Sequence, residues 1–353
     1  MEKKVWWHTT FGEITVEEPV FRNTEQQFRP FSRSAEITTR CCSMLLQRAI
    51  TDFGADHAFG QVPKKLQEHY GIDISVSTIR ALTEHHAEQM YEQQKVPAEP
   101  SETAGCKWLV GEMDGSMVPI VTVDEKAEDK RKNKTLHWQE ARLALAHEVG
   151  STTLKFGAVF EGSVEDAGQQ WLNCARLAGF GSETHLHGVG DGAAWIAQQI
   201  GGKFGAQGSY LVDFYHVCDY LAAASATCAP EAAKAWTAAQ KESLKNNDYQ
   251  RVIDNLTPHL EADTIKDDKA PVRACHRYLS NRTDQLNYKT AIAKGLPIGS
   301  GEIESAHRYI IQERLKLPGA WWKAANVDPM LALRVVRANG GWHDYWKNVA
   351  EAA

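Results

Sequence analysis

Three aspartates in the middle of the chain follow short apolar runs that are typical of core strands. Asp114 ends the run WLVGEM, Asp191 ends the run HLHGVG, and Asp213 ends the run SYLV. Carboxylates at the ends of core strands lie at the edge of a sheet, where ligands bind in open α/β folds. An isolated charge at such a place is costly unless it meets a metal or a partner, and Mg²⁺ prefers carboxylate oxygens. We therefore expect a site for a hard divalent cation.

Each of these aspartates also has a purely structural interpretation. Asp-Gly is a frequent turn pair, so Asp114 before Gly115 and Asp191 before Gly192 are also typical turn formers. The three acids together, with a glutamate-bearing helix expected over 301–315, favour the cation site over three separate turns.

The segments around these acids alternate between strands and helices. Helices are expected over 163–180, with Ser163 as the N-cap, and directly after residue 192. Strands are expected over 107–123 (two runs around Asp114), 140–149, 153–161, 185–192 and 209–216. Three strands followed by helix, strand, helix and strand predict a mixed α/β layer. Residues 217–295 are polar and are predicted to be almost wholly helical.

The N-terminal third has a different pattern. Residues 1–33 are predicted to contain a β-hairpin around Phe11-Gly12-Glu13. Residues 34–92 are predicted to be helical, beginning with a helix over 34–53 that places Leu45 on its apolar face. Residues 93–105 hold prolines and polar residues without periodicity, which is typical of a linker.

The helical region has the layout of a helix-turn-helix. One helix is predicted to end at Gly71, and a second is predicted to be capped by Ser75 or Ser77. The second helix of such a motif can enter a major groove, and Arg80 on it is a candidate DNA contact. A helical hairpin that only packs against the core is the alternative.

Composition and charge leave the question of DNA binding open. The formal net charge is −6, whereas phosphate binding needs basic surface. Residues 305–353 are locally basic, with seven Lys and Arg against four Asp and Glu. No apolar run approaches the ~20 residues that span a bilayer, so we expect a cytoplasmic protein. The seven cysteines form no CxxC pair, which argues against a zinc ribbon.

Four motifs follow one another along the chain: DG at 114–115, GDGAAWI at 190–196, DFYH at 213–216, and PIGSGEIES followed by QERLK at 297–316. Together they resemble the bacterial insertion-sequence transposases of the Kra type, which are relatives of the Mutator-like transposases. The resemblance covers almost the whole chain. It implies a ribonuclease-H-like catalytic core over 106–221 and 296–353, interrupted by an all-helical insertion over 222–295.

The resemblance also implies a catalytic triad of carboxylates, DDE. Asp114 would come from the first strand, Asp191 from the fourth, and Glu304 from a helix after the insertion. Glu302 competes with Glu304, but the family pattern places its glutamate after Ile or Val, as Glu304 follows Ile303. The triad would hold two divalent cations, Mg²⁺ or Mn²⁺, for strand cleavage at element ends and strand transfer to target DNA.

Asp213 and His216 resemble the Asp-x-x-His motif of the same family. The resemblance implies that His216 orients the scissile phosphate or assists the leaving group. A histidine that caps a helix or supports the site from behind is the alternative.

Further residues are candidate contacts to DNA, which we expect a homodimer to bind at the nucleoid. Arg308, Arg314 and Lys316 follow Glu304 and are candidates for phosphate contacts. Trp236 is a candidate for stacking on an unpaired base, with ordinary helix packing as the alternative. Two other functions remain open: a nuclease of the same fold without strand transfer, and a domesticated transposase that only binds DNA.

Overall fold

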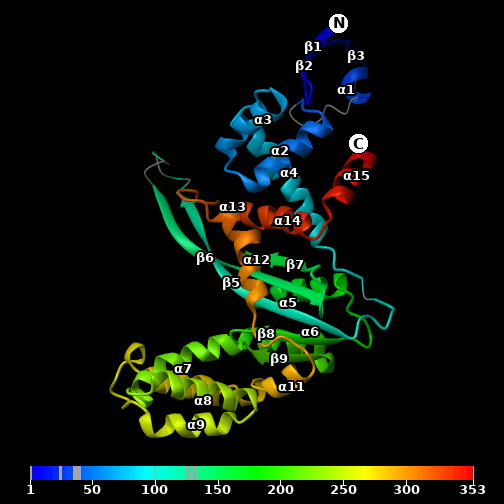
Figure 1. Cartoon of the computed structure of the whole chain (residues 1–353). Coiled ribbons are helices and arrows are strands. Elements are labelled where there is room, and N and C mark those ends of the chain that lie inside the picture. The colour runs from blue at the N-terminus through cyan, green and yellow to red at the C-terminus, as the bar shows by residue number, and fades with distance from the viewer. Residues whose placement is uncertain are drawn as a thin grey trace. The chain divides into compact units, whose positions relative to one another are not determined.

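The structure is a computed structural model that describes residues 2–23, 26–34, 41–99, 101–124, 126, 129 and 133–352 (Figure 1). The chain divides into two compact units, each assembled from segments that are distant in the sequence. Unit 1 comprises Met1–Pro97, Ser116–Ala141 and His307–Ala353, and unit 2 comprises Ala98–Gly115 and Arg142–Ala306.

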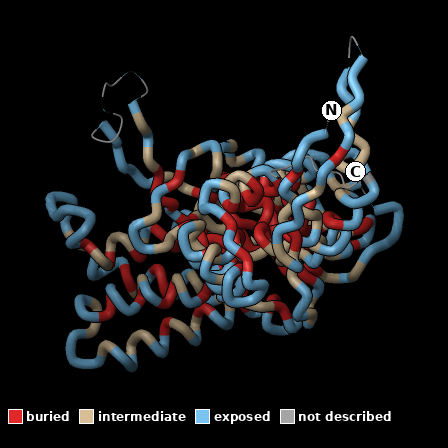
Figure 2. Tube along the Cα trace, turned by 90° about the horizontal axis from the view of Figure 1, so that it is seen from above, coloured by how far each residue is buried: buried red, intermediate tan, exposed pale blue. Residues whose placement is uncertain are grey.

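Unit 1 begins with the predicted hairpin. Strands β1 (Glu2–Thr9) and β2 (Gly12–Pro19) pair antiparallel, and the ladder closes at Thr9↔Gly12. Gly12 has a φ of +114°, which a glycine adopts without strain. Figure 2 shows that most of the hairpin is exposed. Short elements follow it: β3 (Phe21–Arg22), β4 (Gln27–Phe28) and α1 (Pro30–Ser34).

Three helices form the next part of unit 1. They are α2 (Met44–Asp56), α3 (Val62–Tyr70) and α4 (Val76–Gln94), with the 3₁₀ turn η1 (Phe59–Gln61) between the first two. Leu46, Leu66 and Ile79, one from each helix, share one buried cluster. The predicted helix, glycine turn and helix is confirmed, since α3 ends at Gly71 in the left-handed region. Ser75 caps α4, accepting a hydrogen bond from Thr78 N at 3.2 Å.

The predicted start of the helix over 34–53 is wrong. Residues 35–40 lie outside the described residues, and α2 begins only at Met44. Cys41 has a φ of +55°, which interrupts a right-handed helix, and Ser43 then caps α2. Leu45, expected on the apolar face, is 62% exposed.

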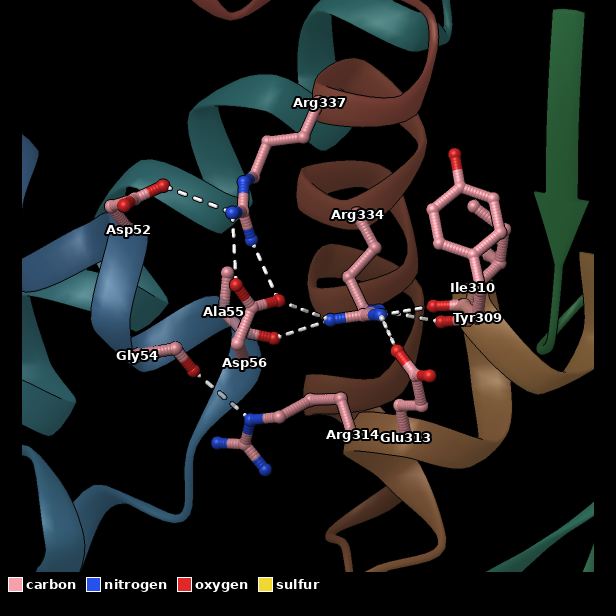
Figure 3. Close-up of polar contacts among 10 residues, drawn as sticks. All are labelled: Asp52, Gly54, Ala55, Asp56, Tyr309, Ile310, Glu313, Arg314, Arg334 and Arg337. Atoms are coloured by element: carbon pink, nitrogen blue, oxygen red, sulfur yellow. Dashed lines mark hydrogen bonds and ion pairs between the residues drawn. The ribbon is translucent and has the colours of Figure 1, made fainter. Parts of the chain in front are cut away.

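The C-terminal part of unit 1 is helical. It contains the π-helical turn η6 (His307–Gln312), α13 (Glu313–Leu315), η7 (Ala324–Asn326), α14 (Val327–Ala338) and α15 (Trp342–Ala352). Figure 3 shows how Arg334 of α14 supports the π-helical turn. Its guanidinium donates to the carbonyl of Ile310 at 2.7 Å, to that of Tyr309, and to Asp56 at 2.8 Å.

Unit 2 contains a five-stranded sheet in the order β7-β6-β5-β8-β9. The strands are β5 (Trp108–Val123), β6 (Lys134–Glu148), β7 (Lys155–Val159), β8 (His185–Gly190) and β9 (Gly208–Val212). In chain order the arrangement is 3-2-1-4-5. β6 and β7 pair antiparallel, whereas β8 pairs parallel with both β5 and β9. β5 and β6 continue into unit 1.

Two helices pack against this sheet. They are α5 (Val164–Leu177) and α6 (Ala194–Phe204), the latter followed by η2 (Gly205–Gln207). Ser163 and Asp166 form a capping box at the start of α5, as the sequence indicates. Trp171 of α5, Leu186 of β8 and Ile200 of α6 are buried in one cluster. The predicted mixed α/β class is confirmed.

The chain between β9 and residue 300 is described throughout and contains no strand. Its helices are α7 (Phe214–Cys228), α8 (Ala233–Lys245), α9 (Tyr249–Leu256), α10 (Pro271–Ser280) and α11 (Tyr288–Ala293), with short turns η3 (Thr257–His259), η4 (Asp267–Lys269) and η5 (Thr283–Gln285). α8 lies beside α7 and α9 (Figure 1). The helix α12 (Gly301–Ala306) ends unit 2. Within the described ranges, every helix is too short or too polar to cross a membrane.

Candidate active site

A pocket of about 270 Å³ in unit 2 contains the carboxylates that the sequence singles out. Asp114, Asp191 and Glu304 all line it, although they are far apart in the sequence. The other lining residues are Met113, Gly190, Asp213, Tyr215, His216, Asp219, Ser300 and Ile303. The pocket therefore lies where β5, β8 and β9 meet the starts of α7 and α12.

Asp114 lies within a continuous strand. β5 runs unbroken from Trp108 to Val123, so the prediction that Asp114 closes its strand at a glycine turn is wrong. The parallel ladder with β8 ends at Glu112↔Val189, two residues before Asp114. On its other side β5 neighbours β6. Asp114 therefore lies at the end of the β5–β8 ladder without being at the end of its own strand.

Asp191 follows β8 directly, as the sequence predicts. Its Oδ1 accepts a hydrogen bond from Ala193 N at 2.8 Å, which forms an Asx-type turn. Gly192 has a φ of +84°, so the turn needs a residue without a Cβ. Since β5 and β8 are parallel neighbours, the end of β8 brings Asp191 to the same sheet edge as Asp114.

Of the two competing glutamates, only Glu304 lines the pocket. Both belong to the first turn of α12. The carboxylate of Glu302 lies 2.5 Å from Nε2 of His147, at ion-pair distance. Adjacent positions on a helix differ by about 100° in direction, so residues two apart face different surroundings. The arrangement agrees with the choice of Glu304 from the family pattern.

Asp213 connects the start of α7 to the segment before α12. Its Oδ1 accepts hydrogen bonds from Tyr215 N at 2.6 Å and His216 N at 3.0 Å, which caps α7. Its Oδ2 accepts from both the N–H and the hydroxyl of Ser300, each at 2.6 Å. Asp213 is 6% exposed and both its oxygens are engaged. Its carboxylate therefore holds backbone in place, although it also borders the pocket.

Glu112 binds the helix that carries Glu304. It lies two residues before Asp114 on β5, hence on the same face of the strand. Its Oε2 accepts a hydrogen bond from Ile303 N at 2.7 Å, which satisfies an N–H of the first turn of α12. Burial, together with the neighbouring acids Glu302 and Asp213, raises the pKa of Glu112 to about 8.

His216 lies at the pocket one helical turn into α7. Its ring packs against Tyr220 and Tyr278 at centroid distances of 5.5 and 5.8 Å. The imidazole thus borders the pocket while resting on two aromatic rings. This position suits a histidine that orients a bound phosphate, and it also suits one that supports the wall.

Sequence reasoning missed three residues at this site. Asp219 adds a further carboxylate to the pocket, three residues after His216 and on the same face of α7. Glu112 and Ser300 hold α12 through the contacts described above. The sequence could have indicated Asp219, because its spacing of three residues from His216 places both on one face of a helix. The pairing of Glu112 with residue 303 depends on tertiary contacts alone.

Arg314 is not a surface cation. It is 2% exposed, and its guanidinium lies 4.7 Å from the rings of both Phe59 and Trp322. Nε donates to the carbonyl of Gly54 at 3.0 Å (Figure 3). This burial corrects the expectation that Arg314 contacts phosphate, because the charge is used inside unit 1. Lys316 is half-buried and donates to the hydroxyl of Ser116 at 2.7 Å.

The other candidate DNA contacts differ in exposure. Arg308 is exposed, and the Arg80 side chain is 62% exposed with Glu84 at 3.8 Å. Trp236 is half-buried and packs against the core of the helical segment. Its position agrees with the helix-packing alternative, whereas Arg80 and Arg308 present accessible cations.

The chemistry of the pocket fits a hard divalent cation. The side chains of Asp114, Asp191 and Glu304 offer carboxylate oxygens. In the part of the chain that the structure describes, no three His, Cys, Asp or Glu side chains are grouped closely enough to hold an ion by themselves. Mg²⁺ keeps several waters and commonly binds one or two carboxylates together with substrate phosphates. The donor set therefore suits cations that also bind waters or the phosphate of a ligand.

Comparison with known proteins adds no family assignment. The chain matches no protein-family model and no curated protein. The basis for a function is therefore the convergence of three carboxylates on one pocket at the edge of the sheet.

Proposed function

We propose that this protein is a DNA transposase of the DDE type, built on a ribonuclease-H-like core. The strand order 3-2-1-4-5 supports this core, with Asp114 on the first strand and Asp191 directly after the fourth. The all-helical segment between β9 and α12 supports an insertion in this core. Glu304 then comes from the first helix after that segment.

The observation that carries the proposal is the shared pocket of Asp114, Asp191 and Glu304. The three acids come from separate segments of the chain and border one pocket, as expected of side chains that share bound cations. Two divalent cations, Mg²⁺ or Mn²⁺, supply activation of a water or 3′-hydroxyl and stabilisation of the leaving oxygen. Asp114, Asp191 and Glu304 are the residues that would hold them.

The residues around the triad have supporting roles in this proposal. Asp213 and Glu112 keep the start of α12 in place and so fix where Glu304 lies. His216 borders the pocket and orients the scissile phosphate or assists the leaving group. The DNA ligands are the terminal repeats of the element and the target, bound by a homodimer in the bacterial cytoplasm. Arg80, Arg308 and Lys316 are the candidate phosphate contacts.

A cleavage and joining assay tests the proposal. Oligonucleotides carrying the flanking element ends are incubated with the protein and Mg²⁺ or Mn²⁺. Asp114→Asn, Asp191→Asn and Glu304→Gln are each expected to lower the rate by at least about 10³-fold, since each removes a group that acts as part of one catalytic unit. Glu302→Gln, which alters the neighbouring glutamate outside the pocket, is the matched control and is expected to retain activity.

The products distinguish transposition from its alternatives. Joining of a 3′-end to target DNA supports strand transfer. Hydrolysis without joining identifies a nuclease of the same fold. DNA binding without any cleavage identifies a protein that only binds DNA. Full activity of any one triad variant removes that residue from the site.

A further inference from the structure

We propose that Tyr278 and Arg282 are positioning residues that hold the Asp191 turn in the shape its carboxylate needs. The inference rests on the proposed role of Asp191 as a cation ligand. Tyr278 belongs to α10, and Arg282 follows one helical turn later. The helical segment between β9 and α12 thus supports the part of the pocket formed by the end of β8.

The turn is held through its backbone. Tyr278 Oη donates to the carbonyl of Asp191 at 2.5 Å, and Arg282 Nε donates to the carbonyl of Gly192 at 2.7 Å. Gly192 N donates to the hydroxyl of Tyr210 at 3.0 Å. Three successive backbone polar groups are therefore bonded to side chains. The turn lies between β8 and α6, and helix α6 has no side-chain cap of its own at Ala193.

Arg282 and Tyr278 lie too close to Gly192 for a side chain at this position. A Cβ built there would lie 2.6 Å from Arg282 Nε and 2.8 Å from Tyr278 Oη. Together with the φ of +84°, this close approach explains the glycine of the Asp-Gly pair. Asp191 and Gly192 therefore form a turn, as Asp-Gly pairs often do. The shape of this turn depends on a helix from elsewhere in the chain.

Both supporting side chains make further contacts of their own. The ring of Tyr278 stacks on Tyr220 of α7 with centroids 4.3 Å apart, and Tyr278 is 7% exposed. The guanidinium of Arg282 lies 4.1 Å from the centre of the Tyr278 ring and donates to the Tyr278 carbonyl at 3.0 Å.

Hydrogen bonds that orient a metal-binding residue affect the affinity of its carboxylate for the cation. Groups that orient a metal ligand typically contribute about 10- to 100-fold in affinity or activity. Loss of the Tyr278 hydroxyl frees the Asp191 carbonyl and widens the range of positions that the carboxylate samples. Cation binding then becomes weaker, while the fold retains its aromatic packing.

The test compares Tyr278→Phe with Tyr288→Phe in the full chain. Both substitutions remove one buried tyrosine hydroxyl from the helical segment, but the hydroxyl of Tyr288 has no hydrogen-bond partner among the described residues. Mn²⁺ binding is measured by electron paramagnetic resonance in the presence of an element-end oligonucleotide, with the oligonucleotide alone as the background and Asp191→Asn as the reference for a lost ligand. We expect Tyr278→Phe to raise the dissociation constant about 10-fold and Tyr288→Phe to leave it unchanged.

A second variant and a second readout separate positioning from stability. Arg282→Gln removes the guanidinium and is expected to weaken Mn²⁺ binding in the same direction. Hydrogen exchange of the peptide covering residues 189–196 is expected to accelerate in both Tyr278→Phe and Arg282→Gln. A lower unfolding midpoint with unchanged Mn²⁺ affinity would show that both residues only stabilise the fold. This result would overturn the inference.

The reference variant shows which proposal fails. If Asp191→Asn weakens Mn²⁺ binding but Tyr278→Phe does not, the positioning role is wrong and the cation site stands. If the unaltered protein and Asp191→Asn bind Mn²⁺ equally or not at all, the proposed cation site fails and the positioning role fails with it.

Discussion

The imidazole of His86 is enclosed in the core of unit 1. His86 is 2% exposed, with Nδ1 2.7 Å from the hydroxyl of Tyr345 and Nε2 3.0 Å from the amide oxygen of Gln47. Burial, together with the adjacent His85, lowers the pKa of His86 to about 4. The folded protein therefore holds this histidine neutral at a pH where an unfolded chain already binds a proton.

This burial predicts a dependence of stability on pH. Because the folded pKa lies below the unfolded value of about 6.5, the contribution of His86 is complete above pH 6.5 and is lost as the pH falls towards 4. The free energy of unfolding should fall by up to about 1.4 kcal/mol per pH unit in that window. Urea unfolding of the native chain and His86→Gln at several pH values measures it. A stability difference that stays constant between pH 6.5 and 4 would contradict the prediction.

Helix α12 depends on hydrogen bonds from distant parts of unit 2. Asp213 binds Ser300, and Glu112 binds Ile303 N, so the first turn of α12 is capped by a strand and by the start of another helix. Unsatisfied N–H groups at a buried helix start are costly. The placement of Glu304 thus follows from two acids that do not themselves need to contact substrate.

Removing parts of this cap should have graded effects. Asp213→Asn replaces one acceptor oxygen by an amide that cannot accept, so we expect a loss of about 2–3 kcal/mol of unfolding free energy. Ser300→Ala removes only the hydroxyl contact and should lose about 1 kcal/mol. Urea denaturation measures both. An equal effect of the two substitutions would indicate that the capping of α7 by Asp213 adds nothing.

The π-helical turn η6 is supported by Arg334, which is 5% exposed. Arg334→Met would leave the carbonyls of Tyr309 and Ile310 without this donor and Asp56 without a buried partner (Figure 3). We expect a loss of about 2–3 kcal/mol from the lost hydrogen bonds of a charged donor, since Asp56 is 44% exposed and keeps its ion pair with Arg337. Arg337→Met, which removes a more exposed ion pair with the same Asp56, should cost about 1 kcal/mol. Thermal and urea unfolding compare the two.

Taken over the full chain, the net charge is −6, so the proposed DNA binding would depend on local cations. Each phosphate contact releases counterions, so the logarithm of affinity falls linearly with the logarithm of salt concentration. Arg80→Ala and Arg308→Ala should each reduce that slope by about 0.9 if the side chain contacts a phosphate. Arg314→Lys should lower stability and leave the slope unchanged, because Arg314 is buried. Fluorescence anisotropy over a range of salt concentrations measures the slopes.

Much of the fold was predictable because its signals are local. Gly71 ends α3, Ser75 caps α4 and Ser163 caps α5, and each effect involves only neighbouring residues. The start of α2 was mispredicted because the apolar pattern continued past a left-handed residue, Cys41. The glycine after Asp114 suggested a turn, but β5 runs on past it as a central strand between β6 and β8.

The primary structure alone predicts the residue types of the candidate site and their order along the chain. It also predicts the alternation of strands and helices. Folding alone decided that β5 lies between β6 and β8, that Glu304 faces the pocket while Glu302 faces His147, and that Arg314 is buried. It also decided that Tyr278 reaches the Asp191 turn. These outcomes depend on contacts between residues distant in the chain, and no local spacing encodes which distant partner a side chain meets.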